Sequence, residues 1–305
     1  LLGAERVWSA QNTFMANDDF VALPDGRRVC LVTHGNPQGQ PVFLLHGTPG
    51  SRLGHEFADQ PAKDRGIPVL CPDRPGIGRP DPKPGRTIVS YATDIREVAL
   101  ALGIHHYGVV GYSGGGPYAL ACGAGTPDNI VAIAGMAGVG PVHGPRAFDG
   151  LAKTDLRFLK LARQQPWLGR MLMRVLVTGT RLSPKAAIKT LGRELSAVDG
   201  HAIREEDPRT LMASFIEASR QGPAGPLEDY RLLGSDWGFG LADIGLPVHL
   251  WQGDADQAVP LHHAEWMATQ LPNATVHRLA GEGHMSIQRH VGDILSSAAG
   301  RLRGA

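Results

Sequence analysis

The stretch that decides the fold is Gly111-Tyr112-Ser113-Gly114-Gly115-Gly116-Pro117, which places a serine among glycines in the pattern G-x-S-x-G. The apolar run at 107–111 predicts a buried strand before it, and 117–122 predicts a helix after it. A sharp turn from strand to helix lifts a serine clear of the sheet, where its hydroxyl can act as a nucleophile. A phosphate-binding loop would need G-x-x-x-x-G-K-S/T or G-x-G-x-x-G, and the stretch contains neither. We therefore expect Ser113 to be a nucleophile.

The glycines around Ser113 fit this interpretation. The turn crowds the positions two residues before and two residues after the nucleophile, where Gly111 and Gly115 have no side chain. The backbone N–H of Gly114 is expected to serve as one donor to an oxyanion, beside the positive end of the following helix. Pro117 is tolerated there because the first turn of a helix has no internal partners for its N–H groups.

Apolar runs and turns alternate on both sides of this stretch. Pro24-Asp25-Gly26 predicts a hairpin between strands at 20–23 and 29–32. Further buried strands are predicted at 42–45 and 69–71, and further strands at 130–136, 248–251 and 275–279. Helices are predicted at about 52–65, 90–102 (capped by Ser90), 261–271 and 287–302. This order predicts one mostly parallel sheet with helices on both faces, an α/β fold.

The strand pattern stops after about residue 140 and resumes near 248. Helices are expected at 151–161, 168–177, 184–195 and 209–220. We therefore divide the chain into a core of residues 15–140 and 236–305 and a helical insertion of residues 141–235, with residues 1–14 as an N-terminal arm or an extension. The dense apolar run at 168–177 either lines a pocket or packs on the core.

The composition is that of a globular protein. The 305 residues are 42% hydrophobic and 19% charged, with a net charge of +1, which gives no overall field to attract nucleic acid or an anionic membrane. No run approaches the roughly 20 apolar residues of a membrane span. Cys30, Cys71 and Cys122 are widely spaced in apolar runs and are expected to be buried free thiols, typical of a reducing, cytoplasmic compartment.

The near-neutral net charge results from opposite charges in two parts of the chain. The insertion carries 15 Lys and Arg against 10 Asp and Glu, a net of +5, and the remainder carries a net of −4. Two interpretations follow: a basic insertion that favours substrates bearing a carboxylate or phosphate, or ordinary outward-facing charges on amphipathic helices.

Beyond the G-x-S-x-G pattern, two more motifs resemble those of the α/β-hydrolase superfamily. His46-Gly47-Thr48-Pro49-Gly50 resembles the H-G-x-P-G element after the third strand, and Asp73-Arg74-Pro75-Gly76-Ile77-Gly78 resembles the D-x-x-G-x-G turn after the fourth. The resemblance implies the α/β-hydrolase fold, with an eight-stranded, mostly parallel sheet, flanking helices and a helical cap at 141–235. It also implies that the Thr48 N–H is the second oxyanion donor and that His46 supports the loop rather than acting as the base.

The resemblance further implies a chain order of serine, acid and histidine. Residues 253–260 resemble G-x-x-D-x-x-V-P, which selects Asp256 as the acid, with Asp254 as its rival and helix capping as the alternative role. Gly281-Glu282-Gly283-His284 resembles the G-x-G-H loop and selects His284 as the base.

No metal site is expected. His262 and His263 are adjacent but lack a third ligand at suitable spacing, so we expect a solvated helix start.

These residues predict a cofactor-independent serine hydrolase that cleaves a small or medium carboxylic ester. Serine argues against the superfamily's dehalogenases and epoxide hydrolases, whose nucleophile is Asp. A proline iminopeptidase-like peptidase or amidase is the runner-up, although those enzymes favour Gly where Thr48 stands and Trp where Gly114 stands. The same residues would also suit a carbon–carbon bond hydrolase, or a ligand-sensing protein that keeps the triad. The expected partner is a small-molecule substrate, with no nucleic acid, and the protein is expected to be a monomer or homodimer.

Overall fold

The computed structural model describes residues 18–144, 146–205 and 208–301. The N-terminal segment 1–14 expected from the sequence lies outside the described residues. Within the described ranges, no helix combines the length and the apolar character needed to cross a membrane.

An eight-stranded sheet organises the core, in the order β1-β2-β4-β3-β5-β6-β7-β8. β2 pairs antiparallel with both β1 and β4, and all other neighbours are parallel. The strands are β1 (Asp19–Ala22), β2 (Arg28–Gly35), β3 (Val42–Leu45), β4 (Pro68–Pro72), β5 (Tyr107–Tyr112), β6 (Ile130–Met136), β7 (Val248–Gly253) and β8 (Ala274–Leu279). The predicted hairpin, the predicted strands and the mostly parallel sheet are confirmed, and β8 is the strand that has no buried residue.

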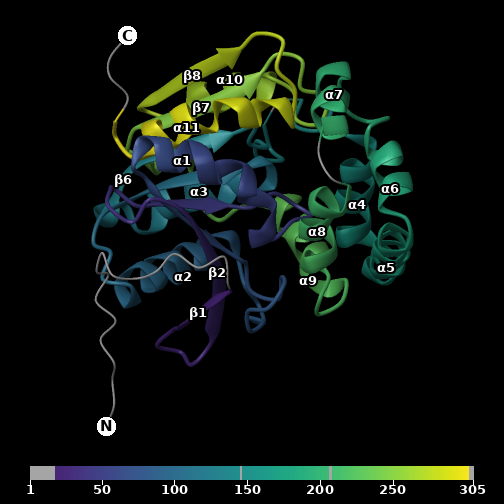
Figure 1. Cartoon of the computed structure of the whole chain (residues 1–305), viewed down its shortest axis with the longest axis horizontal. Helices are drawn as coiled ribbons and strands as arrows, with labels where there is room; N and C mark the ends of the chain where they lie inside the picture. Colours follow the sequence, from purple (N-terminus) through teal and green to yellow (C-terminus); the bar gives the residue numbers. More distant parts are fainter. Residues whose placement is uncertain (1–17, 145, 206–207, 302–305) are drawn as a thin grey trace.

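Helices cover both faces of the sheet (Figure 1). α1 (Asp59–Arg65) and α11 (Val291–Ala298) pack together over one face, while α2 (Ile88–Ala101) and α3 (Gly116–Gly125) pack together over the other. α10 (His262–Gln270) packs beside β7 and β8. Because the strands from β3 to β8 along the sheet order run parallel, the loops that follow β3, β5, β7 and β8 meet at one edge, where α/β proteins place their sites.

In the described part of the chain between β6 and β7, six α-helices gather at one end of the sheet (Figure 1). They are α4 (Lys153–Gln164), α5 (Pro166–Leu182), α6 (Pro184–Leu191), α7 (Ala197–Glu205), α8 (Pro208–Ala218) and α9 (Ala224–Leu233). The sequence pattern missed α7 and α9. Both contain poor helix formers, Gly200 in α7 and Gly225 with Pro226 in α9, and most of α9 is buried, so we attribute its helicity to packing rather than to local propensity.

Two further expectations need correction. Thr87, not Ser90, caps α2: Thr87 Oγ1 accepts the Ser90 N–H and Ser90 Oγ accepts the Thr87 N–H, each at 2.9 Å. The last helix begins with a 3₁₀ segment at Ser286–His290 and continues as α11 only to Ala298.

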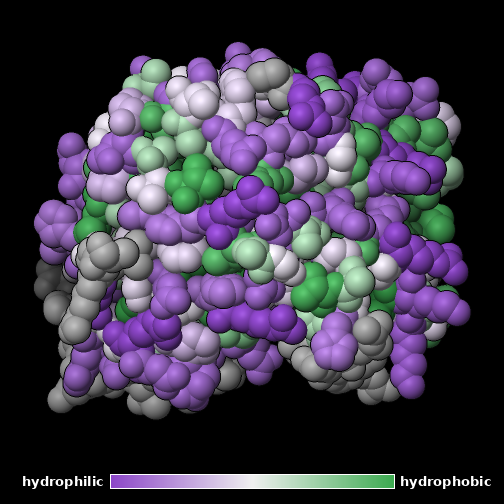
Figure 2. Space-filling model, turned by 90° about the horizontal axis from the view of Figure 1, so that it is seen from above, coloured by the Kyte–Doolittle hydropathy of each residue, from purple (hydrophilic) through white to green (hydrophobic). Residues whose placement is uncertain are grey.

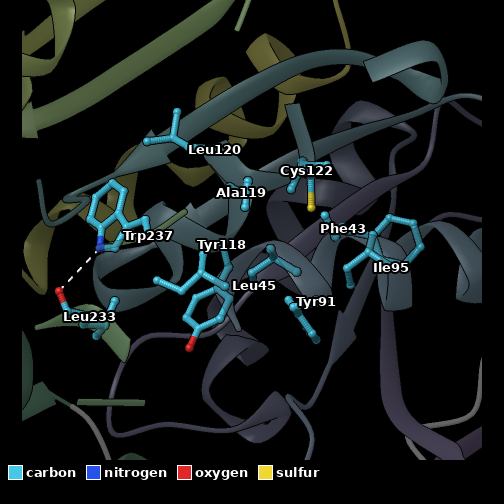
Figure 3. Packing of buried hydrophobic residues seen from close by; sticks show 14 of the residues in the cluster. Phe43, Leu45, Tyr91, Ile95, Tyr118, Ala119, Leu120, Cys122, Leu233 and Trp237 are labelled. Atoms are coloured by element: carbon cyan, nitrogen blue, oxygen red, sulfur yellow. Dashed lines mark hydrogen bonds between the residues drawn. The ribbon is translucent and has the colours of Figure 1, made fainter. Parts of the chain in front are cut away.

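The larger hydrophobic core runs from the α2 and α3 face of the sheet into the insertion. Figure 3 shows Trp237 beside Leu233, with its indole N–H directed at the Leu233 carbonyl 3.4 Å away, and Tyr118 near Leu45. The three cysteines are buried and free, as expected.

Trp237→Ala should lower the free energy of unfolding by about 3–5 kcal/mol, because it removes a large side chain that is only 3% exposed. Trp167→Ala is the matched control: Trp167 is 66% exposed, so its loss should cost less than about 1 kcal/mol. Urea unfolding followed by circular dichroism measures both. Equal losses in the two variants would contradict the assignment of Trp237 to the core.

Candidate active site

Ser113 sits on a sharp turn between β5 and α3 and has a φ of +54°. A Cβ at Gly111 would lie 2.4 Å from the Gly115 carbonyl oxygen, and a Cβ at Gly115 would lie 2.3 Å from the Leu45 carbonyl oxygen. Side chains cannot approach backbone oxygens so closely. Both glycines are therefore required for the steric reason expected from the sequence.

His284 lies between Ser113 and Asp256. Its Nδ1 is 2.8 Å from Asp256 Oδ2, and its Nε2 is 3.0 Å from Ser113 Oγ. Because an ionised carboxylate only accepts hydrogen bonds, Nδ1 carries the proton, which leaves Nε2 to accept the Ser113 hydroxyl. The three residues expected from the sequence are therefore joined in one relay, from loops after β5, β7 and β8.

Asp256 is held in place by several donors. Its Oδ1 accepts the N–H groups of Ala258 and Val259 at 2.8 and 2.9 Å, and Gln252 Nε2 donates to Oδ2 at 2.9 Å. The rival carboxylate, Asp254, is exposed and accepts the Gly281 N–H instead. The structure places Asp256, not Asp254, against His284.

The loop after β3 touches the turn that carries Ser113. A Cβ added to Gly114 would lie 2.7 Å from Thr48 Oγ1 and 2.8 Å from Thr48 Cβ. Thr48 and Gly114, the two expected oxyanion donors, are thus neighbours beside Ser113.

His46 takes no part in the relay. Its Nδ1 donates to the Gly47 carbonyl at 2.9 Å and its Nε2 accepts the Arg74 N–H at 3.3 Å. Burial, and then the charge of Arg74, hold the pKa of His46 well below its ordinary value. A neutral His46 that bridges two loops matches the supporting role implied by the family resemblance.

A buried ionic cluster, which no sequence pattern predicted, supports the Thr48 loop. Arg74 donates to the carbonyls of His46 and Gly47 at 2.6 and 2.9 Å and to Asp229 Oδ2 at 2.8 Å. Asp229, on α9, also accepts from Arg86 at 2.5 Å. The D-x-x-G-x-G motif contained Arg74, but no local signal pointed to Asp229, 155 residues away.

A second carboxylate from the insertion, Asp199 on α7, holds the His284 loop. It is fully buried and accepts the N–H groups of His284, Met285 and Ser286 at 2.9, 2.7 and 2.9 Å. A Cβ at Gly283 would lie 2.3 Å from Asp199 Oδ2, so the second glycine of the G-x-G-H motif makes room for this carboxylate. No local sequence pattern indicated Asp199 either.

The adjacent histidines differ from expectation. His263 is buried, not solvated: its Nδ1 accepts the Gly140 N–H at 2.9 Å, and burial, then the neighbouring His262, lower its pKa to about 4. Across the described residues, no group of three or more His, Cys, Asp or Glu side chains is arranged to hold a metal.

A cavity of about 790 Å³ opens at Ser113 and His284 and extends between the core and the insertion. Its walls are mainly apolar, with Phe57, Phe158, Leu195 and Phe215 among them. The run at 168–177 divides: Met173 and Val177 pack in the core, whereas Val175 and Leu176 line the cavity.

The charged side chains lining the cavity are all acidic, if only described residues are counted: Glu56, Asp155 and Glu194. Asp155 Oδ1 accepts the Tyr230 hydroxyl at 2.6 Å, and burial raises the pKa of Asp155. The basic residues of the described insertion do not line the cavity, which favours the interpretation of outward-facing charges.

The alpha/beta hydrolase fold family model matches residues 40–290. The match covers most of the chain, and the fold and the strand-turn-helix at Ser113 agree with it. The chain therefore belongs to the alpha/beta hydrolase fold family.

Individual relatives are distant. A pimeloyl-(acyl-carrier protein) methyl ester esterase from Aromatoleum aromaticum is 35% identical over 95 residues, which is 31% of this chain and only 38% of that relative. A magnesium-chelatase 30 kDa subunit from Rhodobacter capsulatus is 29% identical over 268 residues, 84% of each chain. Among solved structures, an esterase (EaEST) from Exiguobacterium antarcticum superposes with a TM-score of 0.69 at 20% identity, covering 92% of this chain and 98% of that one. At this identity the structural likeness shows the fold alone.

Proposed function

We propose that this protein is a serine hydrolase that cleaves carboxylic esters through an acyl-enzyme. The observation that carries the proposal is the relay in which His284 Nε2 lies 3.0 Å from Ser113 Oγ and His284 Nδ1 lies 2.8 Å from Asp256. A nucleophile, a base and an orienting carboxylate within hydrogen-bond reach are what acyl transfer to serine requires. The esterase name of the Aromatoleum relative agrees with this chemistry.

In the proposed mechanism, His284 Nε2 takes the Ser113 proton as Oγ attacks the ester carbonyl. Asp256 stabilises the positive charge of the imidazolium, which then gives that proton to the leaving alcohol. A water molecule, deprotonated by His284 in turn, attacks the acyl-enzyme and releases the acid. These steps use only side chains of this chain and water.

The backbone N–H groups of Thr48 and Gly114 are the proposed oxyanion donors. They lie on the two loops that contact each other beside Ser113, and α3 begins at Gly116 with its positive end toward the same place. Each such donor typically contributes about 10²–10³ in rate.

Residues 141–235 are proposed to act as a cap on a core of residues 15–140 and 236–305. Insertion residues such as Phe158, Leu176 and Phe215 form one wall of the cavity, and core residues such as Phe57 and Ser113 form the other. A cap in this place would exclude water from the reacting ester and shape the acyl pocket.

Ester hydrolysis is favoured over an iminopeptidase-like activity by the contact between Thr48 and Gly114. A side chain at 114 would collide with Thr48, so the Trp that iminopeptidases favour after the nucleophile does not fit this oxyanion loop.

Ser113→Ala should lower kcat for a p-nitrophenyl ester by at least about 10⁴-fold, because it removes the nucleophile. A fluorophosphonate should modify Ser113 in the wild-type chain, detected by mass spectrometry of the labelled peptide. Asp254→Asn is the control for the acid, since Asp254 is exposed and outside the relay, and it should retain activity that Asp256→Asn loses. Unchanged hydrolysis by Ser113→Ala would refute the proposal, and rapid labelling without turnover would favour a ligand-sensing protein.

The acidic limb of the profile of kcat/KM against pH should lie above about 6.5, the ordinary histidine value. Burial by itself would lower the pKa of His284, but the carboxylates of Asp256, Asp199 and Asp155 raise it. A base works only when neutral, so activity is lost as the pH falls through this raised pKa. Asp199→Asn removes one of these charges and should move the limb to lower pH. Exposed Asp149→Asn should leave it in place, and a limb unmoved by Asp199→Asn would contradict the role of that charge.

Neutral esters should react faster than esters whose acyl chain ends in a carboxylate, by about tenfold or more in kcat/KM. The acidic residues of the cavity repel an anion, and no described Lys or Arg lines the cavity to compensate. A panel of neutral, anionic and ammonium-bearing esters of matched length tests this. Asp155→Asn should reduce the difference in kcat/KM between the neutral and the anionic esters. A preference for the anionic ester would instead support a basic cap that selects anions.

A further inference from the structure

The outer surface of α5 carries a strip of exposed apolar side chains, Trp167, Met171, Val175 and Leu182. Their exposed fractions are 66%, 52%, 62% and 82%. The spacing of four, four and seven residues places them on one side of the helix, over roughly 22 Å at 1.5 Å per residue. We call these four residues the apolar strip. Large side chains on a folded surface are seldom so exposed in a group without a partner.

A second strip lies beside it on the same helix. Arg170, Arg174 and Arg181 are exposed and form no ion pair with any described residue. α6 adds the exposed Lys185 and Lys189, and neither helix contains an Asp or Glu. We call these five residues the cationic strip.

The surrounding chain strengthens the positive charge. Residues 153–193 hold ten Lys and Arg and one acid, Asp155, which lines the cavity instead. The net charge of +1 for the whole chain therefore conceals a strongly basic region. Figure 2 shows hydrophobic and hydrophilic groups side by side at the end of the molecule where the insertion lies.

Other residues of α5 and α6 face the cavity, where Leu176, Thr180, Ala187 and Leu191 form part of its wall. Val175 belongs both to the apolar strip and to the cavity lining. The two strips are therefore the outside of the wall whose inside surrounds the candidate site.

We propose that the apolar and cationic strips together dock the protein on an anionic lipid bilayer. The apolar strip would insert among the upper acyl chains and the cationic strip would contact lipid phosphates. Large apolar residues beside Lys and Arg on one helix are the pattern of an interfacial helix, and two such signals are needed for stable attachment. An uncharged, apolar ester dissolved in the bilayer would then reach the cavity wall directly. The docking does not depend on the proposed hydrolysis, so each can fail alone.

Vesicle flotation tests the proposal with the full chain. The wild type should float with vesicles of equimolar phosphatidylglycerol and phosphatidylcholine, and much less with phosphatidylcholine alone. Arg174→Glu should weaken binding to the anionic vesicles by about tenfold or more. Each basic residue near an anionic membrane surface strengthens binding by an amount of this order, and the change to Glu also adds a repelled charge. Ser113→Ala should bind as the wild type does, because turnover is not required.

Arg96→Glu is the matched control, since Arg96 is also exposed within a helix, α2, and its reversal changes the net charge equally. It should bind the anionic vesicles nearly as well as the wild type. Equal losses in the two variants would overturn the proposal, because binding would then follow net charge rather than this surface.

Penetration of the apolar strip into the bilayer is measured separately. Lipids with brominated acyl chains should quench the tryptophan fluorescence of the wild type, and Trp167→Phe should lose most of that quenching. No vesicle binding at either composition would overturn the proposal. So would a dimer in sedimentation analysis that Trp167→Ala converts to monomer without any vesicle binding, since the strip would then be an interface between two copies of the chain.

Discussion

The buried pairing of Asp229 with Arg74 and Arg86 holds the candidate site together. Burial alone would raise the pKa of Asp229, but the two guanidinium groups hold it well below its usual range. Removing the Asp229 carboxylate would leave two buried guanidinium groups without this counter-charge, which is strongly unfavourable. Because Arg74 also donates to the carbonyls of His46 and Gly47, the same pairing links the loop that carries Thr48 to α9.

The insertion also contacts the His284 loop through a buried carboxylate. Asp199, on α7, accepts three backbone N–H groups of the His284 loop, so His284 is positioned from outside the core. The insertion also carries charges of opposite sign on its inner and outer surfaces. Its described inner wall is apolar and acidic, whereas its outer surface is apolar and basic. One segment thus supports the site, lines the cavity and presents the outer surface.

The parts of the structure that the sequence predicted well are those with local causes. The turn at Ser113 needs glycines at fixed offsets, and a hairpin needs its turn residues, so each leaves a readable pattern. The helices α7 and α9 leave none, because glycine and proline weaken their propensity and packing restores it. The solvated position expected for His263 is wrong for a related reason: its partner, the Gly140 N–H, lies 123 residues earlier in the chain.

The sequence by itself determined the strand-turn-helix at Ser113 and the alternation of strands and helices that makes a mostly parallel sheet. These follow from periodicity and from steric rules that act over a few residues. The same local reasoning indicated Gly114, and family resemblance then selected Thr48, Asp256 and His284. Only the tertiary structure decided how these residues meet and that Asp256 rather than Asp254 faces His284. It alone brought Asp229 and Asp199 to the site, because hydrogen bonds across 85 or 155 residues leave no local trace in the chain.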